Sequence, residues 1–169
     1  MTRMRLALCL IGMFAVALLG ATAQASPPEP FTISLDFYQT GPDTAAGEFE
    51  ATGAIEDSGL GSETFHFSPP VLQPEDILRA RTCHGEKELV GAEGDTIIIR
   101  FQGRVKNMGA LIEGRFTILG GTGAYENLHG TGTFIAEAEP VELPDGTQTF
   151  NIVATYEGRA QYDNRRSSR

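Results

Sequence analysis

The densest group of chemically reactive side chains is the run RARTCHGE, which spans Arg79 to Glu86. A cysteine beside cations can have a lowered pKa and act as a nucleophile or a redox sensor. If the run is a strand, Arg79, Arg81 and Cys83 share one face. His84 then points to the other face and cannot pair with the cysteine. Structural cysteines are commoner than catalytic ones, so we interpret Cys83 as a small buried thiol beside arginines that pair with acids at a rim.

Carboxylates are the second group of side chains that could carry chemistry. A glutamate that faces an apolar interior has a raised pKa and can serve as a general acid or base. Most acidic side chains instead solvate an outer face, and alternation alone does not single out an exception. The candidates are Glu48, Glu50, Glu63, Glu113 and Glu126.

The sequence lacks the spacings of common metal sites. His66, His84 and His129 are widely separated, and neither zinc-type Cys/His spacing nor a calcium-loop pattern of acids occurs. Cys9 lies in an N-terminal segment that we expect to be removed, which leaves Cys83 without an internal disulfide partner. We therefore predict no metal and no cofactor.

The N-terminal segment has the three parts of a secretory signal peptide. Arg3 and Arg5 are followed by an apolar run over 6–19 and then by Ala23-Gln24-Ala25, a small-residue cleavage site. The apolar run is shorter than the about 20 residues that a membrane-spanning helix needs. The sequence therefore predicts a signal peptide over 1–25, cleavage after Ala25, and a secreted or periplasmic protein.

A single domain is expected after the signal peptide. Residues 26–30 form a proline-rich leader, 31–163 form the domain, and 164–169 form a disordered basic tail. The whole chain carries a formal net charge of −9. This acidity argues against nucleic acid and anionic lipid as partners, because both are bound by clustered Lys and Arg. No stretch after the signal peptide is apolar enough to span a bilayer.

Alternation of apolar and polar residues indicates short β-strands throughout this domain. The clearest strands are 31–37 and 95–101, and Asn107-Met108-Gly109 and Pro144-Asp145-Gly146 indicate hairpin turns. About eight strands without a long amphipathic helix predict an all-β fold, which is either a sandwich or a barrel.

Three further features follow from the alternation. Residues 57–61, Asp-Ser-Gly-Leu-Gly, are predicted to be a loop, and 86–90 give only a weak strand signal. The expected inward-facing side chains are rich in aromatic residues and could line or fill an interior. They are Phe31, Ile33, Leu35, Phe37, Phe49, Ile55, Phe65, Phe67, Phe101, Phe116 and Phe134.

The most specific stretch is GRFTILGGTGAYENLHGTGTF, residues 114–134. It indicates a strand, a glycine-rich corner, a short helical plug and a second strand. The corner could be called a phosphate loop, but it lacks the lysine and the following helix of such a loop. We favour a bend that lets Tyr125 and Leu128 close one end of the fold.

The same residues resemble a motif of the allene oxide cyclase and dirigent-type β-barrels, and of bacterial secreted proteins with this barrel. The resemblance implies a single antiparallel barrel of about eight strands and so favours a barrel over a sandwich. It also implies association through outer faces, and hence a homo-oligomer. The matching positions include Phe116, Ile118 and Ala124 together with the expected structural motif, Gly114, Gly120, Gly121, Thr122, Gly123, Tyr125, Gly130 and Gly132.

The resemblance also implies a range of functions. Allene oxide cyclases close a cyclopentenone ring on a fatty-acid epoxide, and dirigent proteins steer the coupling of phenoxy radicals. Both act mainly by shaping an apolar cavity, and the matched corner is architectural, so no catalytic residue is assigned. We favour a barrel that binds a small apolar molecule or a protein partner without catalysis. An enzyme acting on an apolar substrate, and a structural envelope-associated domain with a filled interior, are the alternatives.

The interior of the barrel separates these hypotheses. An open cavity is needed for ligand binding or catalysis, whereas a structural domain needs a filled core. A buried carboxylate or arginine in the cavity would favour chemistry, and an entirely apolar lining would favour carriage. The candidate lining or rim residues are Phe37, Phe49, Phe67, Arg81, Cys83, Phe101 and Tyr125.

Overall fold

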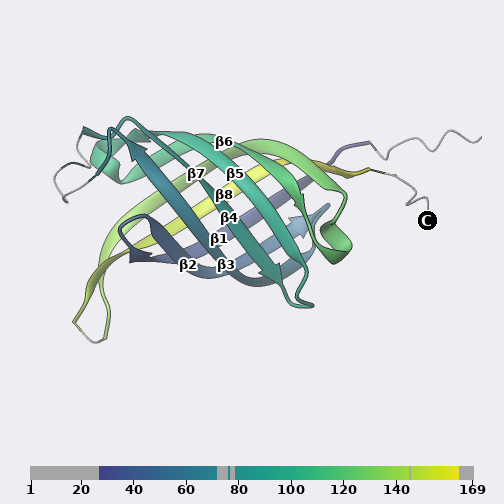
Figure 1. The fold of residues 1–169 in the computed structure, drawn as a ribbon, viewed down its shortest axis with the longest axis horizontal. Helices are drawn as coiled ribbons and strands as arrows, with labels where there is room; N and C mark the ends of the chain where they lie inside the picture. Colours follow the sequence, from purple (N-terminus) through teal and green to yellow (C-terminus); the bar gives the residue numbers. More distant parts are fainter. Residues whose placement is uncertain (1–26, 72–75, 77–78, 145, 164–169) are drawn as a thin grey trace, which may run out of the picture.

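Eight antiparallel strands close into a barrel (Figure 1). This computed structural model describes residues 27–71, 76, 79–144 and 146–163. Each strand pairs with its neighbours in sequence, and the first pairs with the last. The predicted all-β barrel of about eight strands is thereby confirmed. The strands are β1 (Glu29–Gly41), β2 (Thr44–Gly53), β3 (Asp57–Ser68), β4 (Thr82–Gly91), β5 (Thr96–Lys106), β6 (Leu111–Gly121), β7 (Leu128–Glu142) and β8 (Gln148–Tyr162).

The interior is built from alternate residues of each strand. In β1 the side chains of Phe31, Ile33, Leu35 and Phe37 are buried, while their neighbours lie toward the outside. This pattern follows from the pleat, which directs successive side chains to opposite faces. All eleven residues expected to face inward are buried except Phe67, which is half-buried and packs against the core.

The two ends of the barrel are formed by different connections (Figure 1). The β1–β2, β3–β4, β5–β6 and β7–β8 connections meet at one end, which carries the single-turn helix η2 (Asn107–Gly109). We call this the η2 end. The β2–β3, β4–β5 and β6–β7 connections form the other end, where β1 begins and β8 ends. This second end carries η3 (Gly123–Tyr125), and we call it the η3 end.

The glycine-rich corner closes the η3 end. Tyr125 and Leu128 are both buried in the core, and the Tyr125 hydroxyl donates a hydrogen bond to Asp57 Oδ2 over 2.9 Å. Gly123 has a φ of 54°, and a Cβ there would lie 1.8 Å from Asp95 Oδ1. A side chain at this position is therefore strained in conformation and would also have to displace the Asp95 carboxylate. The corner acts as a plug, in agreement with its architectural interpretation.

Asp57 is held at the η3 end as an ionised acceptor. Burial raises the pKa of this carboxyl group, but hydrogen bonds from the Ala92 N–H, the Tyr125 hydroxyl and the Ser58 N–H outweigh it. The net result is a lowered pKa, because all three donors favour the charged form. The plug is thus tied to the beginning of β3.

Two boundaries differ from the sequence prediction. Residues 57–61, expected to be a loop, form the first part of β3: all five pair with β2, and 59–61 also pair with β4. Gly59 permits this pairing, because a Cβ there would lie 2.1 Å from the Val90 carbonyl oxygen. Glu29 and Pro30, placed in the leader, begin β1 and pair with β8. The proposed signal peptide over 1–25 and the tail over 164–169 lie outside the described residues.

Candidate ligand pocket

A cavity of about 560 Å³ occupies the barrel at the η2 end. Its outer lining comes from strand ends and connections, and includes Gln39, Pro42, Gly109 and Phe150. Its inner lining comes from the buried middle of the strands. Ligand pockets typically measure about 300–1,000 Å³, so the space suits one small molecule. We call it the η2 cavity.

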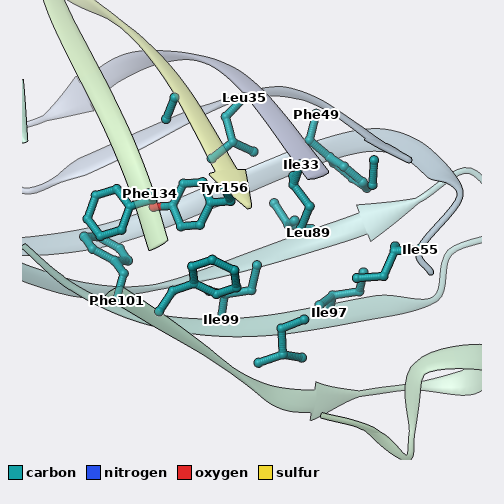
Figure 2. Close-up of a cluster of buried hydrophobic side chains, with 14 of the residues drawn as sticks. Ile33, Leu35, Phe49, Ile55, Leu89, Ile97, Ile99, Phe101, Phe134 and Tyr156 are labelled. Carbon is teal, nitrogen blue, oxygen red and sulfur yellow. The ribbon is translucent and has the colours of Figure 1, made fainter. Parts of the chain in front are cut away.

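The lining of the η2 cavity is mainly apolar and aromatic. Phe134 stacks on Tyr156 with ring centroids 4.9 Å apart, and Phe101 meets Phe134 edge-on at 5.7 Å. Figure 2 shows these three rings together at one end of the buried cluster, with Ile55 and Ile97 at the other end. The two isoleucines are fully buried and do not line the cavity. The η2 cavity thus lies toward the η2 end, whereas fully buried aliphatic side chains pack toward the η3 end.

A buried ion pair lies among the aromatic rings at the inner part of the cavity. Lys87 Nζ is 2.7 Å from Glu63 Oε2, and the exposed fractions of the two side chains are 2% and 7%. The two residues are directly opposite in the β3–β4 register. Glu63 shares its strand face with Phe65, and Lys87 shares its face with Leu89, so the pleat directs both inward. This pair is the charged centre of the site.

Three aromatic rings enclose the Lys87 ammonium. Its Nζ lies 4.4 Å from the ring centroid of Tyr156, 4.9 Å from that of Phe101 and 5.5 Å from that of Phe37. Such contacts stabilise a cation by about 2 kcal/mol when the site is desolvated. Burial lowers the pKa of Lys87, but Tyr156 and Glu63 outweigh burial and leave the pKa raised. The raised pKa keeps the amine protonated at neutral pH, and an ammonium is not a nucleophile.

Glycines on the inner face make room for two of these rings. A Cβ at Gly61 would lie 2.5 Å from Phe37 Cζ, and one at Gly85 would lie 2.8 Å from Phe101 Cζ. Gly61 and Gly85 precede Glu63 and Lys87 by two residues on the same strand faces. The two rings that these glycines admit, Phe37 and Phe101, both lie against the Lys87 ammonium.

Tyr156 and Cys83 are the other titratable groups of the inner lining. Burial raises the pKa of Tyr156 to about 12, against the opposing effect of Lys87. Burial and Glu63 likewise raise the pKa of Cys83 to about 12, with Lys87 again opposing. Both groups keep their protons at neutral pH. A thiol of this kind is a poor nucleophile, which supports the structural interpretation of Cys83.

The seven candidate residues divide into two groups. Four of them, Phe37, Phe67, Cys83 and Phe101, line the η2 cavity. The other three do not line it: Phe49 is buried in β2, Tyr125 belongs to the plug, and Arg81 is exposed.

The reactive run at 79–86 is only partly a strand. β4 begins at Thr82, so Arg79 and Arg81 lie before the strand. The shared face of Arg79, Arg81 and Cys83, expected if the whole run were a strand, is therefore not formed. Cys83 is buried and His84 is exposed, so these two neighbours do point apart. His84 faces His66 across the β3–β4 pair on the outside, with ring centroids 5.8 Å apart.

The ion pair was not predicted as such. The sequence leaves Glu63 as one of five candidate glutamates and does not single out Lys87. A signal was present, since for each charged residue the neighbours within four positions on the same strand face are apolar or glycine. In the described part of the chain, no group of three or more His, Cys, Asp or Glu side chains could hold a metal ion. Nor is any helix in these ranges long and apolar enough to cross a membrane.

Comparisons with protein families, with curated proteins and with solved structures found no match to this chain.

We expect Cys83 to make the unfolding free energy fall between pH 9 and pH 10. The ordinary pKa of the thiol is 9.0 and the folded value is about 12, so in this range only the unfolded chain loses the proton. A raised folded pKa gives stability that is complete below the unfolded pKa and is lost as pH rises. The contribution of Cys83 to the slope should approach about 1.4 kcal/mol per pH unit near pH 10, and the slope is measured by urea unfolding at several pH values.

The control for this prediction is Cys83→Ala. Tyr125, Tyr156, Tyr162 and Lys87 also have raised pKa values, but because their ordinary values are 10.0 or 10.5 each of them contributes less than Cys83 in this range. The variant should lose about half of the slope between pH 9 and pH 10 whatever its absolute stability. An unchanged slope in the variant would contradict the assignment to Cys83.

Proposed function

We propose that this barrel binds one small, largely apolar molecule in the η2 cavity and performs no chemistry on it. The observation that carries the proposal is the half-hollow interior, an aromatic-lined space of about 560 Å³ whose buried charges form a closed pair. A structural domain with a filled core would leave no such space. Burial of apolar ligand surface against this lining would provide most of the affinity.

The pKa values of the buried titratable groups favour binding over catalysis. General acid–base catalysis works best with a group whose pKa is near the working pH. Tyr156 and Cys83 both have pKa values of about 12, and the pKa of Lys87 is raised, so none of the three exchanges a proton readily at neutral pH. Glu63 is held by Lys87 at 2.7 Å.

Catalysis on an apolar substrate is the second candidate function. It is favoured by one observation, the buried carboxylate of Glu63 at the cavity wall. Buried charged groups in a cavity cluster at functional sites, although structural ion pairs have the same appearance. If catalysis occurs, Glu63 is the residue that would contact the substrate.

We also propose that the protein is exported and belongs with the allene oxide cyclase and dirigent-type barrels. Export is supported by the signal-peptide pattern at 1–25. The family is supported by the motif over 114–132 and is compatible with an eight-stranded barrel whose motif corner closes one end. Association through the outer face remains part of this proposal.

Binding can be tested with N-phenyl-1-naphthylamine, a neutral dye whose fluorescence rises in apolar surroundings. The dye should bind saturably with one molecule per barrel. Its emission should shift to shorter wavelength, because the cavity excludes water. A fluorescence that rises only linearly with dye concentration would contradict a ligand cavity.

A further inference from the structure

We infer that the natural ligand of the η2 cavity carries a hydroxyl group at its inner end, which donates a hydrogen bond to Glu63. We also infer that the cavity rejects carboxylates. The inference rests on the proposed function, because it names the chemical class of the molecule bound at the same site. It follows from which polar atoms the cavity leaves accessible and from their charge.

Glu63 is the more accessible side chain of the buried pair. The Glu63 side chain keeps 7% of its surface exposed and Lys87 keeps 2%, and both line the cavity. An ionised carboxylate offers about four acceptor positions and no donor. Lys87 occupies part of this capacity, so acceptor capacity remains for a ligand. The complementary ligand group is therefore a hydrogen-bond donor.

The ammonium, by contrast, is already satisfied. Lys87 pairs with Glu63, hydrogen-bonds Tyr156, and lies against the rings of Phe101 and Phe37. A ligand that offers only an acceptor would have to displace one of these contacts. A hydroxyl group avoids that conflict because it can donate to Glu63.

The charge of the lining disfavours an anionic ligand. Among the described lining residues Lys87 is the sole base, and Glu63 already neutralises it. The third charged residue of the lining, Glu137, is another acid. A ligand carboxylate near Glu63 would be an unpaired like charge in an apolar space, which is strongly unfavourable. A long-chain acid should therefore bind more weakly than the matching alcohol.

Three probes of one chain length separate these chemistries. 1-Decanol can donate and accept, decyl methyl ether can only accept, and decanoate is an anion at pH 8. Each is titrated against bound N-phenyl-1-naphthylamine. We expect 1-decanol to displace the dye at a concentration at least tenfold lower than the ether, and decanoate to be weakest. Equal displacement by alcohol and ether, or better displacement by decanoate, would overturn the inference while leaving the cavity as a binding site.

The double variant E63L/K87M tests whether the ion pair is what selects the alcohol. It replaces a buried pair with apolar side chains of similar size, a change that folded proteins commonly tolerate. The alcohol and the ether should become equal within about threefold in this variant, because the acceptor is gone. A preserved preference would also overturn the inference.

A matched control removes an ion pair outside the cavity. E86L/R100M deletes the exposed pair in which Arg100 Nη2 lies 2.7 Å from Glu86 Oε1. The preference for 1-decanol should be unchanged in this control. Failure of the dye or of all three probes to bind would instead refute the proposed function itself, so the two failures are distinguishable.

Discussion

Lys87→Met should destabilise the barrel by about 3–5 kcal/mol, because it leaves the Glu63 carboxylate buried without its partner. The pair is almost completely buried at 2.7 Å, and the cation also loses its three ring contacts. The unfolding free energy can be measured by urea titration at pH 7. A loss below about 1 kcal/mol, the usual value of an exposed pair, would contradict this account of the site.

Two further variants separate the buried pair from a general loss of charge. E63L/K87M should recover most of the stability lost in Lys87→Met, since no charge is then left unpaired. Arg100→Met, which breaks an exposed pair on the outside of β5, should change the unfolding free energy by less than about 1 kcal/mol. If the double variant is as unstable as the single one, the buried charge is not the cause.

Ala138→Phe should weaken dye binding at least tenfold, because it places an aromatic ring inside the η2 cavity. Ala138 is half-buried, lines the cavity and pairs with Ile152 of the next strand. The cavity has room for the added ring, so the fold should be retained, with a change in unfolding free energy of about 1 kcal/mol or less. Dye fluorescence titration measures the affinity.

The matched control lies on the outer face of the same strand. Ile135 is 52% exposed, and Ile135→Phe adds aromatic surface without entering the barrel. Dye affinity should be unchanged in this variant. If Ala138→Phe binds the dye as tightly as the unchanged protein, the dye binds elsewhere and the η2 cavity is not the site.

The fold could be predicted because local patterns determine it. Alternation along 31–37 and 95–101 sets which face is inward, and turn residues at Asn107-Met108-Gly109 set a hairpin. The failure at 57–61 has a physical cause. Its glycines and aspartate have low strand propensity, but pairing with β2 on one side and, from Gly59, with β4 on the other overrides that propensity.

The cavity could not be predicted from the same patterns. Both halves of the barrel present apolar side chains inward, and whether a half is hollow depends on side-chain volumes summed across several strands. Small residues such as Ala136 and Ala154 line the hollow half, whereas Ile55 and Ile97 are fully buried outside that lining. Summing these side-chain volumes requires knowing the register between strands, and the alternation within one strand does not specify that register.

The ion pair illustrates the same limit. Glu63 and Lys87 each lie between apolar or glycine neighbours on their strand face, which the sequence of a single strand shows. That the two side chains meet follows only from the β3–β4 register, where the residues are directly opposite. Each buried charge would be unfavourable alone, but the two neutralise each other once β3 and β4 are paired.

Native mass spectrometry of the protein purified from the organism that makes it tests the central claim most directly. The barrel should carry an added mass of one small molecule that is lost under denaturing conditions. The Ala138→Phe variant, produced in the same way, should lack this mass because its cavity is filled. A protein that shows only its own mass, or an added mass that persists unchanged in the variant, would contradict the claim that the η2 cavity binds a small molecule.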